Sequence, residues 1–446
     1  MKKKFIIIFS GAVSLAIYFF LPYDKDVLKG LSILSFIALL WLTEALPVTV
    51  TALIVPIVAV VAGIFNFKTA LSNFAHPIIF LFLGGFALAA ALHKHRMDEM
   101  MAGILLRAAG ERTVLSYLSL FLATMFLSLW ISNTATTAIM LPIAIGMLSG
   151  PEDRNYPRDA FILLGVAYSA NIGGIGTLVG SPPNAITAAV LGLNFLDWLK
   201  VGIPVVIVLM PLMLASLYLI LRPDLSSEIY SRLASSEGIF RDKNRVYIGL
   251  IFLVTVLLWL FSAPLSHFLG IEKDFDSLVA VFAIILLALF KTIEWKEVER
   301  FADWGVLLLF GGGLTLSAVL SETGASEFLA LYVEQNLANY GPFPVLLGSI
   351  ILMIFLTELA SNTASAAIMV PIFLAVGKEL NYPSEDTIAL AVGVAASCAF
   401  MLPVATPPNA LVYGTERVEQ RTMVRAGFLL NMMCAVVIAV MSYLFF

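Results

Sequence analysis

Long apolar segments, separated by short polar loops, run through nearly the whole chain. Each segment approaches the roughly 20 residues that a helix needs to cross the hydrocarbon layer of a bilayer. The pattern therefore predicts about 11 transmembrane helices, at 5–21, 31–46, 51–65, 78–92, 160–191, 203–221, 246–262, 278–290, 304–320, 387–413 and 423–446.

Two further apolar segments, 114–148 and 343–376, have polar residues in their middle. The interruption at 132–143 returns 229 positions later at 361–372, with nine of the twelve residues identical, and both copies begin with Ser-Asn-Thr. Each segment is long enough for two half-spans. We therefore expect two re-entrant hairpins with a Ser-Asn-Thr motif at each tip.

A second pair of polar interruptions follows the hairpins. Gly-Ser-Pro-Pro-Asn at 180–184 lies inside the span 160–191, and Ala-Thr-Pro-Pro-Asn at 405–409 lies inside the span 387–413. Proline lacks an amide hydrogen and disfavours helix at the preceding residue, so both spans should be broken helices. Paired interruptions at corresponding places in two halves indicate the substrate and ion site of a secondary transporter.

The duplicated motifs divide the chain into two repeats. Threading the spans through a bilayer brings the first hairpin in from the cytoplasm and the second from outside, so the repeats should have inverted topology. We expect an all-α polytopic membrane protein, with a first span at 1–29 outside the repeats, repeat 1 at 30–221, a cytoplasmic linker at 222–245 and repeat 2 at 246–446.

Composition supports the membrane class. Hydrophobic residues make up 60% of the chain and charged residues 13%, against about 45–50% and about 25% in soluble domains. Basic residues concentrate in the loops of one side, which predicts a cytoplasmic amino terminus and an external carboxyl terminus in the inner (cytoplasmic) membrane. The net charge is −4, and no basic stripe indicates nucleic acid as a partner.

The breaks indicate what the site binds. Unwinding a helix frees carbonyl groups on one side and amide groups on the other. Carbonyl and side-chain oxygens suit a hard cation such as Na⁺, and amides at positive helix ends suit an anion. No Arg or Lys is expected at membrane depth near either motif. Neutral dipoles and co-bound cations should therefore hold the anion, and its affinity should depend on the cation.

The hairpin tips, the two Pro-Pro-Asn breaks and the stretch 404–412 together resemble the divalent anion/sodium symporter family. That family includes the bacterial and animal sodium-coupled dicarboxylate transporters often called INDY, and the resemblance covers essentially the entire chain. It implies a homodimer in which each protomer has a scaffold domain and a transport domain that moves like an elevator. It also implies at least two sites for co-transported Na⁺.

Carried over residue by residue, the resemblance implies one sodium site for each pair of hairpin and break. The first would use Ser128, Ser132, Asn133 and Gly180, and the second would use Thr357, Ala360, Asn362 and Ala405. The substrate carboxylates would contact Asn133, Thr134, Ser181, Pro182, Ser361, Asn362, Thr363, Thr406 and Pro407.

The sequence thus favours a symporter that carries Na⁺ and C4-dicarboxylates, such as succinate, malate and fumarate, into the cell. A sodium-independent dicarboxylate exchanger, or a symporter of another divalent anion such as citrate or sulfate, would keep the same architecture. An ion channel would need a continuous pore. An enzyme is not expected, because neither Ser132 nor Ser361 has a His or Lys base within its motif.

Single polar residues in the spans have simpler explanations. A lone Ser-Asn-Thr in a membrane helix usually makes interhelical hydrogen bonds, and only its duplication beside duplicated breaks favours a site. Glu358 is expected to brace the second hairpin, and Glu44 to lie at the membrane interface. The tryptophans near span ends are expected to form aromatic belts: Trp41, Trp198, Trp259, Trp295 and Trp304.

Overall fold

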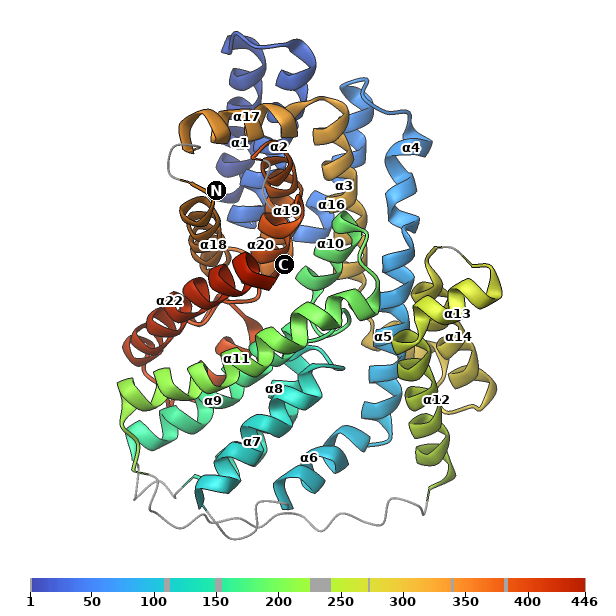
Figure 1. Cartoon of the computed structure of the whole chain (residues 1–446), viewed down its shortest axis with the longest axis vertical. Helices are drawn as coiled ribbons and strands as arrows, with labels where there is room; N and C mark the ends of the chain where they lie inside the picture. The colour runs from blue at the N-terminus through green and yellow to red at the C-terminus, as the bar shows by residue number, and fades with distance from the viewer. Residues whose placement is uncertain are drawn as a thin grey trace.

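Helices make up all the regular structure in the described part of the chain. The computed structural model describes residues 2–107, 113–148, 155–224, 242–271, 273–337, 341–380 and 384–445, and within these ranges no strand occurs (Figure 1). Among the described residues, eight helices are long and apolar enough to cross a membrane. The all-α membrane class is therefore confirmed. Residues 225–241 of the expected linker lie outside the described residues.

The helices before the linker are α1 (Lys2–Phe20), α2 (Lys25–Thr43), α3 (Val48–Val61), α4 (Phe67–Ser72), α5 (Pro77–Lys94), α6 (Met97–Arg107), α7 (Thr113–Ser128), α8 (Asn133–Gly146), α9 (Tyr156–Ile175), α10 (Pro182–Leu191) and α11 (Phe195–Leu221). Those after it are α12 (Lys243–Leu260), α13 (Ser262–Leu269), α14 (Phe275–Leu289), α15 (Trp295–Phe301), α16 (Trp304–Glu322), α17 (Ala325–Leu337), α18 (Pro342–Leu359), α19 (Asn362–Glu379), α20 (Thr387–Ala395), α21 (Pro407–Tyr413) and α22 (Gln420–Phe445).

The two halves repeat the same series of helices. The helices α2 to α11 recur, in order, as α12 and α14 to α22, and the short helix α13 has no counterpart. Each half contains a hairpin, α7–α8 or α18–α19, followed by a broken helix, α9–α10 or α20–α21. The helix α1 precedes the series. This recurrence supports two repeats with an additional first helix.

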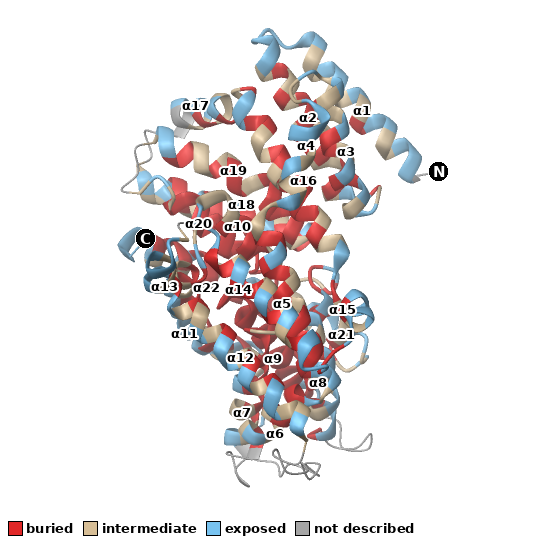
Figure 2. Cartoon of the chain, turned by 90° about the vertical axis from the view of Figure 1, so that its right-hand side faces the viewer, coloured by how far each residue is buried: buried red, intermediate tan, exposed pale blue. Residues whose placement is uncertain are grey.

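The broken helices lie at the centre of the molecule. Figure 2 shows buried residues concentrated along the middle of the structure, where α9 is buried from Arg158 to Ile175 and α20 from Thr387 to Ala395. By contrast, α1 packs on α2 and leaves large apolar side chains such as Phe5 exposed. Helices that are apolar all round belong inside a bundle, whereas exposed apolar faces suit lipid.

Matched close crossings join the two halves. The helix α5 packs on α14, and α3 packs on α16. A Cβ atom at Gly84 would lie 2.6 Å from Cβ and 2.8 Å from the carbonyl oxygen of Ala280. A Cβ atom at Gly312 would lie at the same two distances from Cβ and the carbonyl oxygen of Ala52. Small residues allow such close backbone approach between membrane helices. Each crossing is the counterpart of the other, with the halves exchanged.

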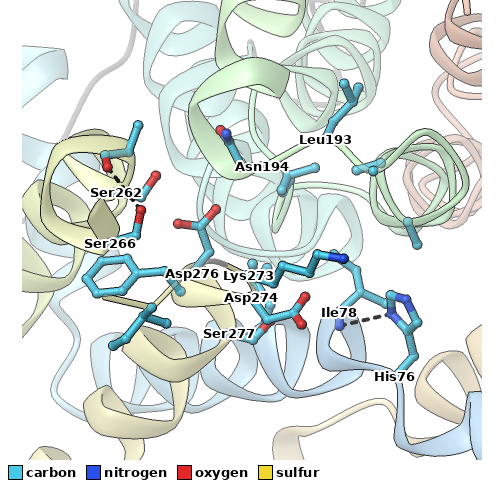
Figure 3. A pocket seen from close by; sticks show the side chains of 18 of the residues that line it. His76, Ile78, Leu193, Asn194, Ser262, Ser266, Lys273, Asp274, Asp276 and Ser277 are labelled. Atoms are coloured by element: carbon cyan, nitrogen blue, oxygen red, sulfur yellow. Dashed lines mark hydrogen bonds between the residues drawn. The ribbon is translucent and has the colours of Figure 1, made fainter. Parts of the chain in front are cut away.

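The last span of the first half is longer than the expected 203–221. The helix α11 begins at Phe195, where the side chains of Asn194 and Asp197 form a capping box. The carboxylate of Asp276, at the start of α14, also accepts a hydrogen bond from the Phe195 amide at 2.6 Å. Both Asn194 and Asp276 line a cavity of about 700 Å³ (Figure 3), which none of the expected site residues lines.

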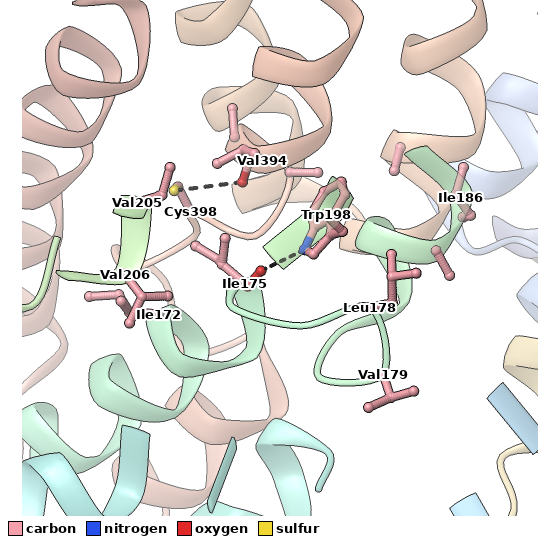
Figure 4. Close-up of a cluster of buried hydrophobic side chains, with 14 of the residues drawn as sticks. Ile172, Ile175, Leu178, Val179, Ile186, Trp198, Val205, Val206, Val394 and Cys398 are labelled. Carbon is pink, nitrogen blue, oxygen red and sulfur yellow. Dashed lines mark hydrogen bonds between the residues drawn. The ribbon is translucent and has the colours of Figure 1, made fainter. Parts of the chain in front are cut away.

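Three tryptophans expected in the aromatic belts are instead completely buried: Trp41, Trp198 and Trp259. Each indole N–H donates to a backbone carbonyl inside the protein, as Trp198 does to Ile175 at 2.8 Å (Figure 4). The expectation was wrong because a position near a span end is also near the ends of neighbouring helices, where an indole N–H finds a buried acceptor. Trp295 and Trp304 remain exposed.

We predict that Gly84→Val and Gly312→Val each lower the melting temperature of the protein in detergent, because the added side chains overlap backbone atoms of Ala280 and Ala52. Overpacking of this kind costs about 1–3 kcal/mol. The matched control is Gly348→Val in α18, where an added Cβ meets no atom within 4 Å. Equal melting temperatures for all three variants, measured by thermal unfolding, would contradict the packing assigned to the two crossings.

Candidate functional site

The four polar interruptions surround one cavity of about 1020 Å³. The hairpin tips contribute Ser132, Asn133, Thr134, Ala360, Ser361, Asn362 and Thr363 to its lining. The breaks contribute Gly180, Ser181, Pro182, Ala405, Thr406 and Pro407. Of the site residues expected from the sequence, only Ser128 and Thr357 do not line it. Segments more than 200 positions apart therefore meet around a single space.

The two halves build this cavity by exchanging helices. The helix α21 packs on α8 and α9 of the first half, and α10 packs on α19 and α20 of the second half. The second part of each broken helix therefore contacts the hairpin of the other half. Because both repeats contribute residues to the lining, the cavity is complete only when the two halves are assembled.

Four of the helices that begin at the cavity start at the motifs, and their first residues are Asn133, Pro182, Asn362 and Pro407. The amino end of a helix carries about half a positive charge, so the longer helices α8, α10 and α19 bring positive ends to the space. Among the described residues that line it, none is Lys or Arg, whereas Glu44 and Asp303 are acidic. The cavity therefore combines neutral donors for an anion with acidic side chains that favour cations.

Oxygen atoms converge at the first hairpin tip. The Ser128 hydroxyl lies 2.8 Å from Oδ1 of Asn133 and 2.7 Å from the carbonyl oxygen of Ala170. A Cβ atom at Gly180 would lie 2.9 Å from the Ser128 carbonyl oxygen and 2.6 Å from that of Gly174. Such a group of hydroxyl, amide and carbonyl oxygens offers the ligands that a hard cation takes.

The second hairpin tip has the same arrangement. The Thr357 hydroxyl lies 2.6 Å from Oδ1 of Asn362 and 2.9 Å from the carbonyl oxygen of Ala396. Ser128 and Thr357 therefore contact the motif asparagines on the side that faces away from the cavity. This explains why neither residue lines the cavity although each contacts a residue that does.

Glu358 braces the second break. Its carboxylate accepts hydrogen bonds from the backbone amides of Phe400, Met401 and Leu402 at 2.6, 2.7 and 3.0 Å. It also accepts one from the side-chain amide of Asn431 in α22 at 2.7 Å. The buried acid thus satisfies amides of the unwound segment and ties that segment to the last helix. Glu358 was expected to brace the second hairpin; its carboxylate instead joins α18 of that hairpin to the break and to α22.

The asparagines that end both Pro-Pro-Asn motifs were not among the expected site residues, and they close the breaks. The Asn184 side-chain amide donates to the carbonyl oxygens of Gly174 and Thr177, each at 2.7 Å. The Asn409 amide donates to the carbonyl oxygens of Ala399 and Leu402 at 3.2 and 3.1 Å. These bonds satisfy carbonyls freed at the end of each preceding helix. A further missed residue, Asn171, lines the cavity from near the carboxyl end of α9.

We predict that Glu358→Gln strongly lowers both the melting temperature and the transport rate. A glutamine keeps the shape but replaces one acceptor oxygen with an NH₂ group, so a buried backbone amide loses its partner at about 1–3 kcal/mol. The matched variant Asn431→Ala leaves the three backbone bonds in place and should cost less. If thermal unfolding and uptake showed Glu358→Gln to be no worse than Asn431→Ala, the bracing role would be wrong.

Comparison with known proteins places this architecture among transporters. A family model described as "Citrate transporter" matches residues 38–391. An uncharacterized transporter of Haemophilus influenzae is 48% identical over 433 residues, which cover 95% of this chain and 93% of the relative. An uncharacterized transporter of Methanocaldococcus jannaschii, MJ0672, is 43% identical, with 94% of each chain covered.

Relatives with a named activity lie at lower identity. The sodium-dependent dicarboxylate transporter SdcS of Staphylococcus saprophyticus is 32% identical, over 94% of this chain and 86% of the relative. Among solved structures, the YdaH transporter of Alcanivorax borkumensis shares the fold with a TM-score of 0.58 at 15% identity, over 84% of this chain and 87% of the other. MtrF of Neisseria gonorrhoeae has a TM-score of 0.57 at 12% identity, over 96% and 97%.

Proposed function

The chain belongs to the divalent anion/sodium symporter family, and from this membership we propose that it carries C4-dicarboxylates together with Na⁺ into the cell. The family and the relatives are transporters rather than enzymes. The observation that carries the proposal is the cavity at which both Ser-Asn-Thr tips and both Pro-Pro-Asn breaks meet. Succinate, malate and fumarate are the proposed substrates.

The chemistry of the cavity supports a dianion held with cations. Helix amino ends and the hydroxyl and amide groups of Thr134, Ser181, Thr363 and Thr406 can donate to carboxylates. Without a lining Lys or Arg, an unpaired dianion would be costly to bury. Two Na⁺ ions, one beside Asn133 and one beside Asn362, would neutralise it. The name of SdcS, a sodium-dependent dicarboxylate transporter, supports the same pairing.

The repeat structure supports alternating access. Each half would supply scaffold helices and one hairpin–break unit, with the divisions 1–29, 30–221, 222–245 and 246–446. The two hairpin–break units would move together as the transport domain of an elevator, within a homodimer. The proposed setting is the lipid bilayer of the cytoplasmic membrane, with the amino terminus inside and the carboxyl terminus outside.

A symporter of citrate is the second candidate, since the matching family model is described as a citrate transporter. A sodium-independent exchanger of dicarboxylates remains the third. Uptake of labelled succinate into proteoliposomes, with and without Na⁺ and at a set membrane potential, separates these possibilities. Two Na⁺ with a dianion would be electroneutral, whereas a third would add about 2.3 kcal/mol per 100 mV.

We predict that Asn133→Ala and Asn362→Ala each reduce succinate uptake at least about tenfold, because each amide would serve both a sodium ion and a carboxylate. Loss of one charge-assisted hydrogen bond alone costs about 1.5–3 kcal/mol. Expression and melting temperature should stay close to wild type. The control is Asn244→Ala at the start of α12, which does not line the cavity. Wild-type uptake by either site variant would count decisively against the site.

We also predict that Na⁺ raises the affinity for succinate. Cations bound first remove most of the cost of burying the dianion, and linkage makes the benefit mutual. Titration of the purified protein with succinate should show the apparent affinity falling about 5- to 150-fold as Na⁺ is removed, with K⁺ or Li⁺ poorer substitutes. An affinity that does not respond to Na⁺ would favour the exchanger.

A further inference from the structure

Asn171 makes a buried hydrogen-bond network in the cavity wall. Its side-chain amide donates to the hydroxyl oxygen of Thr406 at 3.1 Å and to Oδ1 of Asn409 at 3.3 Å. The donor comes from α9 in the first half, and both acceptors belong to the second break. Asn171 is 1% exposed and Thr406 is 4% exposed, so water competes little for these bonds.

The network fixes which end of the Asn171 amide faces Thr406. Asn409 uses its NH₂ group on the carbonyl oxygens of Ala399 and Leu402. Its Oδ1 atom must therefore point toward Asn171. Two amide oxygens cannot face each other in a hydrogen bond, so Asn171 must present its NH₂ group to Asn409 and Thr406.

This arrangement leaves the Thr406 hydroxyl only one function. Its oxygen already accepts from the Asn171 amide and from the Asn409 backbone amide, the latter at 3.2 Å. A hydroxyl has two acceptor positions and one hydrogen, so both acceptor positions are filled. Within the described residues no acceptor is assigned to that hydrogen. Because Thr406 lines the cavity, the hydrogen is left for a ligand there.

The equivalent place in the first break is different. Ser181 forms no side-chain cap on α10, and its hydroxyl lies 3.5 Å from that of Ser397, where either oxygen can donate. Ser397 lies 226 positions after Asn171 and is its counterpart in the second half. The symmetric positions thus carry an amide in one half and a hydroxyl in the other. Of the two hydroxyls, Ser181 at one end of the cavity and Thr406 at the other, only that of Thr406 is restricted to donating.

We propose that Asn171 is a positioning residue that commits the Thr406 hydroxyl to donate to an ionised carboxylate of the substrate. The inference rests on the proposed function and deepens it. The Thr406 end of the cavity would require a hydrogen-bond acceptor and would favour the strongest one, an ionised carboxylate. The Ser181 end would take either an acceptor or a donor, such as a carboxamide or the hydroxyl of a hydroxy acid.

A double-mutant cycle tests this proposal in purified protein at saturating Na⁺. Asn171→Ala and Thr406→Val should each weaken succinate binding about tenfold, as expected for one charge-assisted hydrogen bond. The double variant should bind no worse than Thr406→Val alone, because Asn171 acts through that hydroxyl. Additive losses, or unchanged succinate binding by Asn171→Ala, would overturn the proposal.

A second ligand separates positioning from a merely structural role. Succinamate carries a carboxylate at one end and a carboxamide, which both donates and accepts, at the other. Asn171→Ala frees the Thr406 oxygen to accept, so succinamate could then place its carboxamide there as well and bind in either orientation. The variant should therefore weaken succinate more than succinamate, and the ratio of the succinate affinity to the succinamate affinity should fall. The matched control Ser397→Ala should leave that ratio close to wild type. If the ratio of the succinate affinity to the succinamate affinity were the same in Asn171→Ala as in the wild type, the proposal would also be overturned.

Two measurements distinguish this inference from the proposed function. Wild-type protein that shows no sodium-dependent succinate binding would defeat the proposed function before any variant is tested. Wild-type protein that binds succinate with Na⁺ but shows an additive cycle would defeat only the role of Asn171. Stabilisation by Na⁺ in thermal unfolding verifies that each variant is folded. If Asn171→Ala does not fold, Asn171→Ser replaces it in the cycle, with the same outcomes deciding.

Discussion

The constraint on which this structure depends is the satisfaction of backbone groups inside a membrane. Unwinding a helix there frees carbonyls and amides that lipid cannot satisfy. The protein satisfies them with side chains: Asn184 and Asn409 close the breaks on freed carbonyls, and Glu358 takes three amides of the second break. With these groups satisfied, the hydroxyl and amide groups of the motifs that line the cavity are left for mobile ligands.

Duplicated sequence patterns predicted the parts of this design that depend on local backbone chemistry. The Ser-Asn-Thr motifs lie at the tips between α7 and α8 and between α18 and α19, and the Pro-Pro pairs start α10 and α21. A Pro-Pro pair removes two successive amide donors and ends the preceding helix, whereas single prolines lie inside α3, α8, α11 and α19 without breaking them. All four motifs surround one cavity, which is the arrangement that paired interruptions predict.

The features that sequence could not supply depend on contacts between distant segments. Asn171 is one polar residue in an apolar span, and nothing near it reveals that it meets Thr406 and Asn409. The expectation that Trp198 lies in an aromatic belt failed for the same reason, because its partner carbonyl, that of Ile175, belongs to another helix. The early start of α11 depends partly on Asp276, 81 positions away. Such pairings follow from the tertiary arrangement alone.

The exchanged crossings at Gly84 and Gly312 make each half depend on the other for its packing. Each half places its glycine against an alanine of the other half, so the grooves of one half are filled only by its counterpart. A single half would resemble one subunit of an antiparallel pair, with its mating surface uncovered. Each half therefore acts toward the other as a subunit acts toward its partner in a symmetric dimer, and one continuous chain keeps the two present in equal number.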